Sequence, residues 1–171
     1  MGTEFGGELR NTRAGRQRGR PISTTSGMHV VLRSRQARNA WSFRRVHDEV
    51  ERAIGRFAEA NGVEVRGVAI LTNHIHLYLR FPSRQAYFRF IRALAGSIAL
   101  LVRRSSRGLP PGKPFWDLRP FTRVVAGPQR ERIMARYIRI NQLEAQGCNR
   151  AEARSRAEAE FSSQFRPGKN L

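Results

Sequence analysis

The spacing of hydrophobic residues along this 171-residue chain switches between a period of two and a period of about 3.6. The first period is typical of strands and the second of helices, so the chain is expected to mix both. Apolar, β-branched runs predict four strands, at residues 28–34, 63–71, 73–81 and 121–125. Apolar residues at helical spacing predict three helices, over residues 43–61, 83–104 and 128–147.

The predicted order of elements, β-α-β-β-α-β-α, indicates an α+β protein. Four strands with two crossover helices form a ferredoxin-like βαββαβ antiparallel sheet, here with a further C-terminal helix. Two helices cover one face of such a sheet, and the other face stays available for the third helix or a ligand. Ile133 and Ile140 are expected to anchor the third helix to the sheet.

Composition divides the chain into three segments. Residues 1–27 are rich in Gly, Arg, Ser and Thr and poor in apolar residues, so we expect a disordered basic arm. Residues 28–147 form the folded domain. Residues 148–171 contain helix formers without an apolar stripe, which predicts a charged tail with a loosely docked or frayed helix. Whether the first five residues are a cloning remnant stays open.

The charge of the chain indicates a polyanionic partner. The formal net charge is +19, from 32 basic and 13 acidic residues, and most of the basic residues are arginine. Arginine suits phosphate, so nucleic acid is the expected polyanion. Cys148 is the single cysteine, which excludes an internal disulfide and a cysteine-based zinc site. With no run of about 18 apolar residues and no signal-peptide core, we expect no membrane partner and a cytoplasmic protein that joins the nucleoid when bound to DNA.

Arginines without neighbouring acids are the candidates for DNA contact. The arm contains five, although a solubility tail is an alternative reading of it, and the helix at 83–104 contains basic but no acidic residues. The candidate DNA-binding residues are Arg10, Arg13, Arg16, Arg18, Arg20, Arg84, Arg89, Arg92, Arg103, Arg104, Arg107, Arg119 and Arg123.

Two histidines and a distant tyrosine are the candidate residues of a chemical site. His74 and His76 are two apart on a predicted strand, so they point the same way and could share a metal ion, although strand histidines are often structural. Tyr137 and Asn141 are four apart on the last helix and therefore share a face. The Asn141 amide oxygen suits a third ligand of Mg²⁺ or Mn²⁺ and leaves open coordination positions.

The run T-N-H-I-H-L-Y-L, followed some sixty residues later by R-Y-I-R-I-N, resembles the HUH-type single-strand transposases with one tyrosine. Within that class it most resembles the REP-associated tyrosine transposases. The resemblance covers roughly residues 28–147. This chain departs from the pattern with Leu71-Thr72 in place of the commoner Met-Pro, and with Gln142 where many relatives have proline.

The resemblance implies a DNA transposase in which residues 28–147 are the catalytic domain. His74, His76 and Asn141 would hold Mg²⁺ or Mn²⁺, and Tyr137 would be the nucleophile. Attack on single-stranded or hairpin DNA would give a 5′-phosphotyrosine intermediate and a free 3′-OH, which allows nicking and rejoining. Relatives act as monomers in cis or as homodimers that exchange the tyrosine helix, and the sequence decides neither this nor the target hairpin.

Two other functions stay open. The chain could be a domesticated descendant that binds nucleic-acid hairpins and is no longer mobile, or a ferredoxin-like RNA-binding module with exposed aromatic residues. Tyr78, Phe115 and Trp116 could stack on bases or belong to the core. His29 is expected to be structural or a neighbour of the metal ligands, and Asp117 could contact the metal or orient a base.

Overall fold

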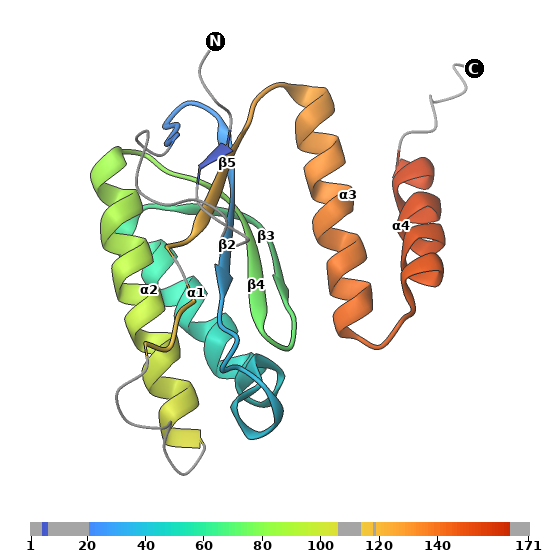
Figure 1. Ribbon diagram of the computed structural model, residues 1–171. Helices are drawn as coiled ribbons and strands as arrows, with labels where there is room; N and C mark the ends of the chain where they lie inside the picture. The colour runs from blue at the N-terminus through green and yellow to red at the C-terminus, as the bar shows by residue number, and fades with distance from the viewer. Residues whose placement is uncertain (1–4, 7–20, 106–113, 118, 165–171) are drawn as a thin grey trace, which may run out of the picture.

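The computed structural model describes residues 5–6, 21–105, 114–117 and 119–164 (Figure 1). The strands are β1 Phe5–Gly6, β2 Gly27–Arg33, β3 Glu64–Ile70, β4 His74–Arg80 and β5 Phe121–Val125. The helices are α1 His47–Asn61, α2 Arg84–Ser105, α3 Pro128–Ala145 and α4 Arg150–Gln164, with two 3₁₀ turns, η1 Asn39–Trp41 and η2 Phe43–Val46.

The strands form one antiparallel sheet in the order β1-β5-β2-β4-β3. Without the two-residue β1, the order β5-β2-β4-β3 is that of a split βαβ sheet, in which each crossover helix skips one strand. The predicted ferredoxin-like α+β fold with a further C-terminal helix is therefore confirmed.

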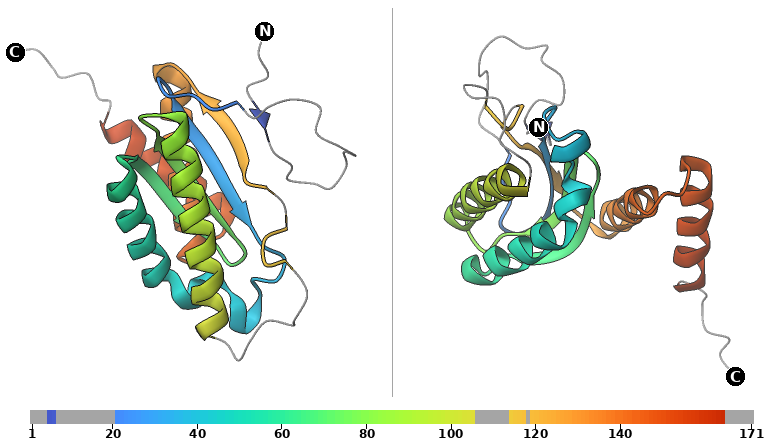
Figure 2. Two further views of the ribbon diagram at one scale, coloured as in Figure 1. Left: turned by 90° about the vertical axis from the view of Figure 1, so that its left-hand side faces the viewer. Right: turned by 90° about the horizontal axis from the view of Figure 1, so that it is seen from below.

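Alternation along the central strands separates an apolar face from a polar one. Met28, Val30 and Leu32 of β2 are fully or almost fully buried in the large core, as are the corresponding alternate residues of β4. Helices α1 and α2 cover this face, whereas α3 covers the other, with α4 beyond it (Figure 2). The intervening residues of β2 and β4 therefore face α3.

Local sequence explains where the helices begin and end. Helix α1 carries Asp48 and Glu49 in its first turn, where carboxylates favour the helix dipole, and ends at Gly62 with a φ of 61°. The expected start of this helix at residue 43 is instead the 3₁₀ turn η2, because the Ser42 side chain accepts a hydrogen bond from Arg44 N–H. Helix α3 begins with Pro128 in its first turn.

Helix α2 is long and apolar enough, by length and composition alone, to cross a membrane. Its residues Phe90, Leu94 and Ile98 are fully buried against the sheet and α1. Packing in the core of the protein thus accounts for its apolar stripe.

Helix α3 approaches the sheet closely over small residues of β3. A Cβ atom on Gly67 would lie 3.1 Å from a methyl group of Ile138, and Ala69 belongs to the same small core as Ile138 and Met134. The expected anchors were wrong. Ile133 is 61% exposed and Ile140 packs toward α4, because the rotation of α3 turns Met134 and Ile138 toward the sheet instead.

The C-terminal segment is more firmly packed than expected. Helix α4 docks on α3 through Ala153 and Ala157, both fully buried against Ile140 and Leu143. Alanine lets two helices approach closely, so a stripe of alanines packs α4 on α3 without larger aliphatic side chains. Ion pairs flank this contact, among them a bidentate pair in which the Arg139 guanidinium lies 2.6 and 2.8 Å from the Glu160 carboxylate.

Residues before 28 also contribute to the described fold. Ile22 packs against the large core and Gly27 opens β2, while Phe5 and Gly6 pair with β5. The arm arginines at 10, 13, 16, 18 and 20, and Arg107, lie outside the described residues.

Gly27 offers a stability test of this packing. A Cβ atom there would lie 2.5 Å from Tyr78 Cε2, and the Tyr78 ring is 4% exposed, so Gly27→Ala overpacks the interior. We expect the free energy of unfolding in urea to fall by about 1–3 kcal/mol. Gly55→Ala is the matched control, because nothing lies within 4 Å of its added carbon and α1 gains helix propensity. It should raise stability by about 0.5–1 kcal/mol. Equal effects of the two changes would contradict this packing.

Candidate active site

Four aromatic rings meet on the face of the sheet that α3 covers. The ring centroids of His74 and His76 are 4.9 Å apart, and that of Tyr137 lies 5.3 Å from His76. His29 completes the group, 5.2 Å from His76 and 5.6 Å from Tyr137. Residues from β2, β4 and α3, separated by up to about a hundred positions in the sequence, thus form one cluster within a single chain.

Strand register explains the cluster. On β2, Val31 lies directly opposite His76 and Arg33 directly opposite His74. His29 is two residues before Val31, so it shares their face and lies diagonally across from His76. Tyr137 reaches the same face from α3, one turn after Met134 and next to Ile138, which pack on the sheet.

Both strand histidines have their Nδ1 atom engaged. The Asn73 side-chain oxygen accepts from the Nδ1–H of His74 at 2.8 Å. The Nδ1 atom of His76 lies 3.0 Å from Nε2 of His29 in a buried hydrogen bond. The Nε2 atoms of His74 and His76 therefore remain as the atoms that could ligate a metal.

Asn141 follows Tyr137 by one turn and is 4% exposed. Its Nδ2–H donates to the Tyr137 carbonyl at 2.7 Å. This bond commits the amide nitrogen to the helix backbone and leaves the amide oxygen as the potential ligand.

Burial keeps the histidines neutral. It lowers the pKa of His76 to about 3, assisted by His29 and His74. Burial, with a smaller contribution from the Arg123 guanidinium, lowers the pKa of His29 to about 4. The pKa of His74 is also lowered, first by burial and then by Arg33. Neutral imidazole is the form that binds metals, so the electrostatics suit ligation at neutral pH.

The donor set fits a hard divalent ion with open positions. Among the described residues, no group of three or more His, Cys, Asp or Glu side chains could hold a metal. The candidate ligands are instead two imidazoles and one amide, which fit Mg²⁺ or Mn²⁺ while leaving room for phosphate oxygens.

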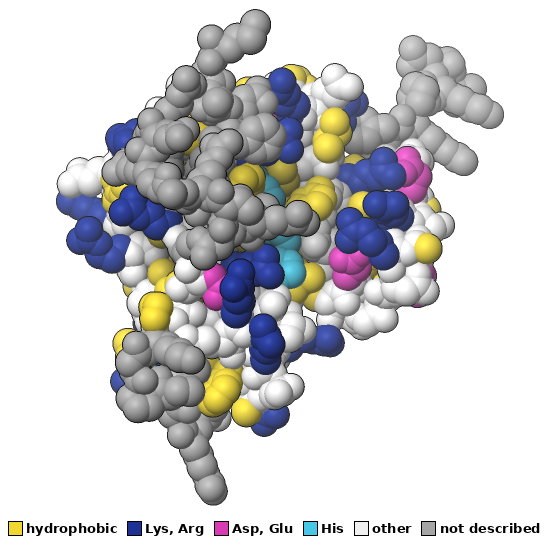
Figure 3. Space-filling view, in the orientation of Figure 1, with side chains coloured by type: hydrophobic (Ala, Val, Ile, Leu, Met, Phe, Trp, Pro, Cys, Tyr) yellow, Lys and Arg dark blue, Asp and Glu magenta, His cyan; other side chains and the backbone are white. Residues whose placement is uncertain are grey.

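Arg33 and Asp117 lie beside His74, which the sequence alone did not predict. The Asp117 carboxylate accepts from Arg35 N–H at 2.6 Å and lies 3.8 Å from Arg33 Nε. Asp117 therefore holds Arg33 beside His74, and contact with a metal or orientation of a base stays a prediction for it. Period-two alternation from His29 could have assigned Arg33 to this face. Histidine side chains reach the surface here beside basic side chains (Figure 3).

Most other predicted site residues lie apart from the cluster, and Arg123 is the exception. Arg84, Arg89, Arg92, Arg103 and Arg104 are exposed on α2, which covers the opposite face of the sheet. Of the remaining candidates, Arg119 is exposed before β5, and Arg123 pairs with His29 across β5 and β2. Tyr78 and Phe115 are each 4% exposed and belong to the packed interior, while Trp116 donates its indole N–H to the Ala95 carbonyl.

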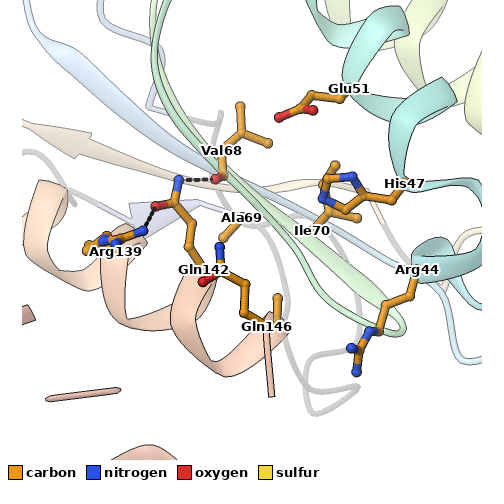
Figure 4. Close-up of a pocket in the computed structure, with 10 residues that line it drawn as sticks. Arg44, His47, Glu51, Val68, Ala69, Ile70, Arg139, Gln142 and Gln146 are labelled. Atoms are coloured by element: carbon orange, nitrogen blue, oxygen red, sulfur yellow. Dashed lines mark hydrogen bonds between the residues drawn. The ribbon is translucent and has the colours of Figure 1, made fainter. Parts of the chain in front are cut away.

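A hollow of about 530 Å³ lies along β3 beside this cluster (Figure 4). Its wall includes Ala69, which pairs with His76, and Gln142, which follows Asn141. The Gln142 amide donates to the Val68 carbonyl at 2.7 Å, which binds α3 to the sheet edge. This bond ties α3, the helix that carries Tyr137, to β3.

The lowered pKa values give the metal-free protein a pH-dependent stability. Below the ordinary value of 6.5 the unfolded histidines take up protons, whereas folded His29, with a pKa of about 4, does not. Stability must therefore fall as the pH drops from about 6.5 toward 4, by up to about 1.4 kcal/mol per pH unit for each such histidine. In EDTA, urea unfolding of His29→Gln between about pH 5 and 6.5 should show a shallower slope than wild type. An unchanged slope would contradict burial of a neutral His29.

Comparisons with known proteins identify the family and the fold of this chain. Residues 23–141 match the family described as IS200-like transposases. The structure of a REP-associated tyrosine transposase bound to a REP hairpin has the same fold, with a TM-score of 0.56 at 13% identity, over 76% of this chain and 74% of that chain. A protein described as a transposase from Deinococcus radiodurans R1 is 21% identical over 77% of this chain and 98% of its own, with a TM-score of 0.48.

No curated protein matches the chain. The family match nevertheless spans well over half of the sequence and includes both strand histidines, Tyr137 and Asn141. The chain therefore belongs to the IS200-like transposase family.

Proposed function

We propose that this transposase nicks and rejoins single-stranded or hairpin DNA through Tyr137, by way of a 5′-phosphotyrosine intermediate. The observation that carries the proposal is the meeting of His74, His76 and Tyr137 on one face of the sheet, with ring centroids about 5 Å apart. A tyrosine beside two neutral imidazoles that can hold a divalent ion is an arrangement suited to phosphoryl transfer to tyrosine.

The covalent step transfers one phosphoryl linkage. The Tyr137 oxygen attacks the scissile phosphorus, an O–P bond forms, and the bond from phosphorus to the 3′ oxygen breaks. The phenolic proton is lost and the departing 3′ oxygen gains one, so the products are a 5′-phosphotyrosyl strand and a free 3′-OH. Because the new ester keeps the energy of the phosphodiester, a 3′-OH can attack it in reverse and rejoin strands without a nucleotide cofactor.

His74, His76 and Asn141 are the residues proposed to hold Mg²⁺ or Mn²⁺. When bound, such an ion polarises the phosphate and stabilises the charge that develops on its oxygens. The chain's own contribution is to aim the Nε2 atoms and the amide oxygen. Asn73 orients His74, and the Tyr137 carbonyl orients Asn141.

We infer that the tyrosine serves the histidines of its own chain. Helix α3 packs on the sheet through Met134 and Ile138, and Tyr137 contacts His29 and His76 without a second copy. This supports cis chemistry, and it is compatible with a monomer or with a homodimer that does not exchange α3.

The proposed substrate rests on charge and on the related structure. A net charge of +19 favours a polyanion, and the related REP-associated transposase was solved with a REP hairpin. Arg33 and Arg123 flank the histidines and are candidates for contacts with the phosphates next to the cleaved bond. A DNA substrate is consistent with a place in the cytoplasm and on the nucleoid.

The test is the capture of the covalent intermediate. Wild-type protein, incubated with a 5′-overhanging hairpin oligonucleotide that is labelled on the 3′ side of the cleavage site and with Mn²⁺, should give a denaturation-resistant protein–DNA adduct on a gel. Tyr137→Phe should lose the adduct by at least about a hundredfold, because it lacks the attacking oxygen. Phe88→Leu, a change at a half-exposed position on the opposite layer, is the control that should retain it.

An adduct that persists in Tyr137→Phe would refute the role of this residue. Tight hairpin binding by wild type without any adduct, over a panel of hairpins, would instead favour the domesticated hairpin-binding protein.

Metal binding makes a separate prediction. Titration calorimetry with Mn²⁺ should show one site, with affinity lost in His76→Ala and reduced about 10–100-fold in Asn141→Ala. Tyr137→Phe should bind Mn²⁺ as wild type does, because the phenol is not proposed as a ligand. If Asn141→Ala bound Mn²⁺ normally, the third ligand would lie elsewhere.

A further inference from the structure

His29 makes a buried hydrogen bond to a proposed metal ligand that packing alone does not explain. Its neighbours on β2, Met28 and Val30, are apolar and wholly buried, and His29 itself is 6% exposed. Burying an imidazole costs free energy unless a partner satisfies it. The described partner of His29 is His76, with 3.0 Å between Nε2 and Nδ1.

A hydrogen bond between two neutral imidazoles has two forms, and they differ in what His76 can do. If His76 Nδ1–H donates to His29 Nε2, the Nε2 of His76 keeps its lone pair and can ligate a metal. If His29 Nε2–H donates, the proton of His76 lies on Nε2 and blocks ligation there. The protonated nitrogen of His29 therefore decides whether His76 can serve as a ligand.

We propose that His29 is a positioning residue of the metal centre: its Nε2 accepts the Nδ1–H of His76 and thereby presents His76 Nε2 to the ion. The inference rests on the proposed function, because it takes His76 as a ligand. It gives His29 the same task toward His76 that Asn73 has toward His74, where an amide oxygen accepts the Nδ1–H at 2.8 Å. Both strand histidines are then held in one tautomer by an acceptor on the side away from the ion.

The surroundings of His29 hold its ring in place for this task. Phe121 lies edge-on at 6.0 Å between ring centroids, and Tyr137 lies edge-on at 5.6 Å. Arg123, opposite on β5, adds a cation that disfavours a second positive charge on the imidazole. Phe121 and Tyr137 thus hold the neutral His29 ring in an orientation in which its Nε2 lone pair points at His76 Nδ1. Because His29 also touches Tyr137, it adjoins both halves of the proposed centre.

The experiment compares His29→Gln with His29→Leu in the full chain. Glutamine can supply an oxygen close to the position of Nε2 and accept from His76, whereas leucine fills space without accepting. Long-range ¹H–¹⁵N correlation spectra of the metal-free protein should show His76 as the Nδ1–H tautomer in wild type and in His29→Gln, and should show the Nε2–H form gaining population in His29→Leu. Mn²⁺ titration should show an affinity loss of about 10–100-fold in His29→Leu and a loss of only a few-fold in His29→Gln.

The outcomes separate this inference from the proposed function. If wild type binds Mn²⁺ and its His76 carries the proton on Nε2, or if His29→Leu binds Mn²⁺ as tightly as wild type, His29 does not position the ligand. Equal losses in both variants, with melting temperatures lowered alike and the tautomer unchanged, would show a packing role and also overturn the inference. If wild type binds no Mn²⁺ and forms no adduct, the proposed function itself fails.

Discussion

The close approach of α3 to the polar face of the sheet is the constraint on which the candidate site depends. Tyr137 can meet the histidines only because β3 presents Gly67 and Ala69 beneath the helix, where a larger side chain would meet Ile138. The Gln142 bond to the Val68 carbonyl then sets the position of the helix along the strand. A shift of about 1 Å is enough to spoil a reacting geometry, so these apolar and backbone contacts belong to the chemistry as much as to the fold.

The two faces of the sheet divide the work of stability and function. Strand β2 gives Met28, Val30 and Leu32 to the large core and His29 and Arg33 to the other side, in strict alternation. The large core under α1 and α2 can therefore support the polar face without taking part in it. The polar face buries His29 and His76 and half-buries His74. Burial of imidazole costs free energy, and two hydrogen bonds compensate for it: one between His29 and His76, and one that His74 donates to the Asn73 side-chain oxygen.

Sequence periodicity predicted the elements well and their rotations poorly. The run F-T-R-V-V predicted β5 at residues 121–125, and Gly62 and Pro128 correctly placed a helix end and a helix start. Spacing shows that Tyr137 and Asn141 share a face of α3, but the sheet surface decides which face points inward, so Ile133 was assigned to the interior and is exposed. The contact between His29 and His76 depends on the register of β2 against β4, which no local pattern encodes. Helix α4 was underestimated because alanines carry little hydrophobic signal in sequence and pack closely all the same.

Acidic residues in this basic chain gather around α3, the helix that carries Tyr137. Glu131 on α3 pairs with Arg66 of β3, and Glu160 on α4 pairs with Arg139 of α3, whereas α2 has no acidic residue at all. Exposed ion pairs of this kind each contribute at most about 1 kcal/mol to the free energy of unfolding. They therefore help to align α3 with its neighbours more than they supply the docking energy. The energy must come from Ala153 and Ala157 on one side of α3 and from Met134 and Ile138 on the other. Helix α3 is thus held between two close-packed surfaces. The carboxylates of Glu131 and Glu160 neutralise part of the positive charge around α3, whereas the charged residues of α2 are all basic.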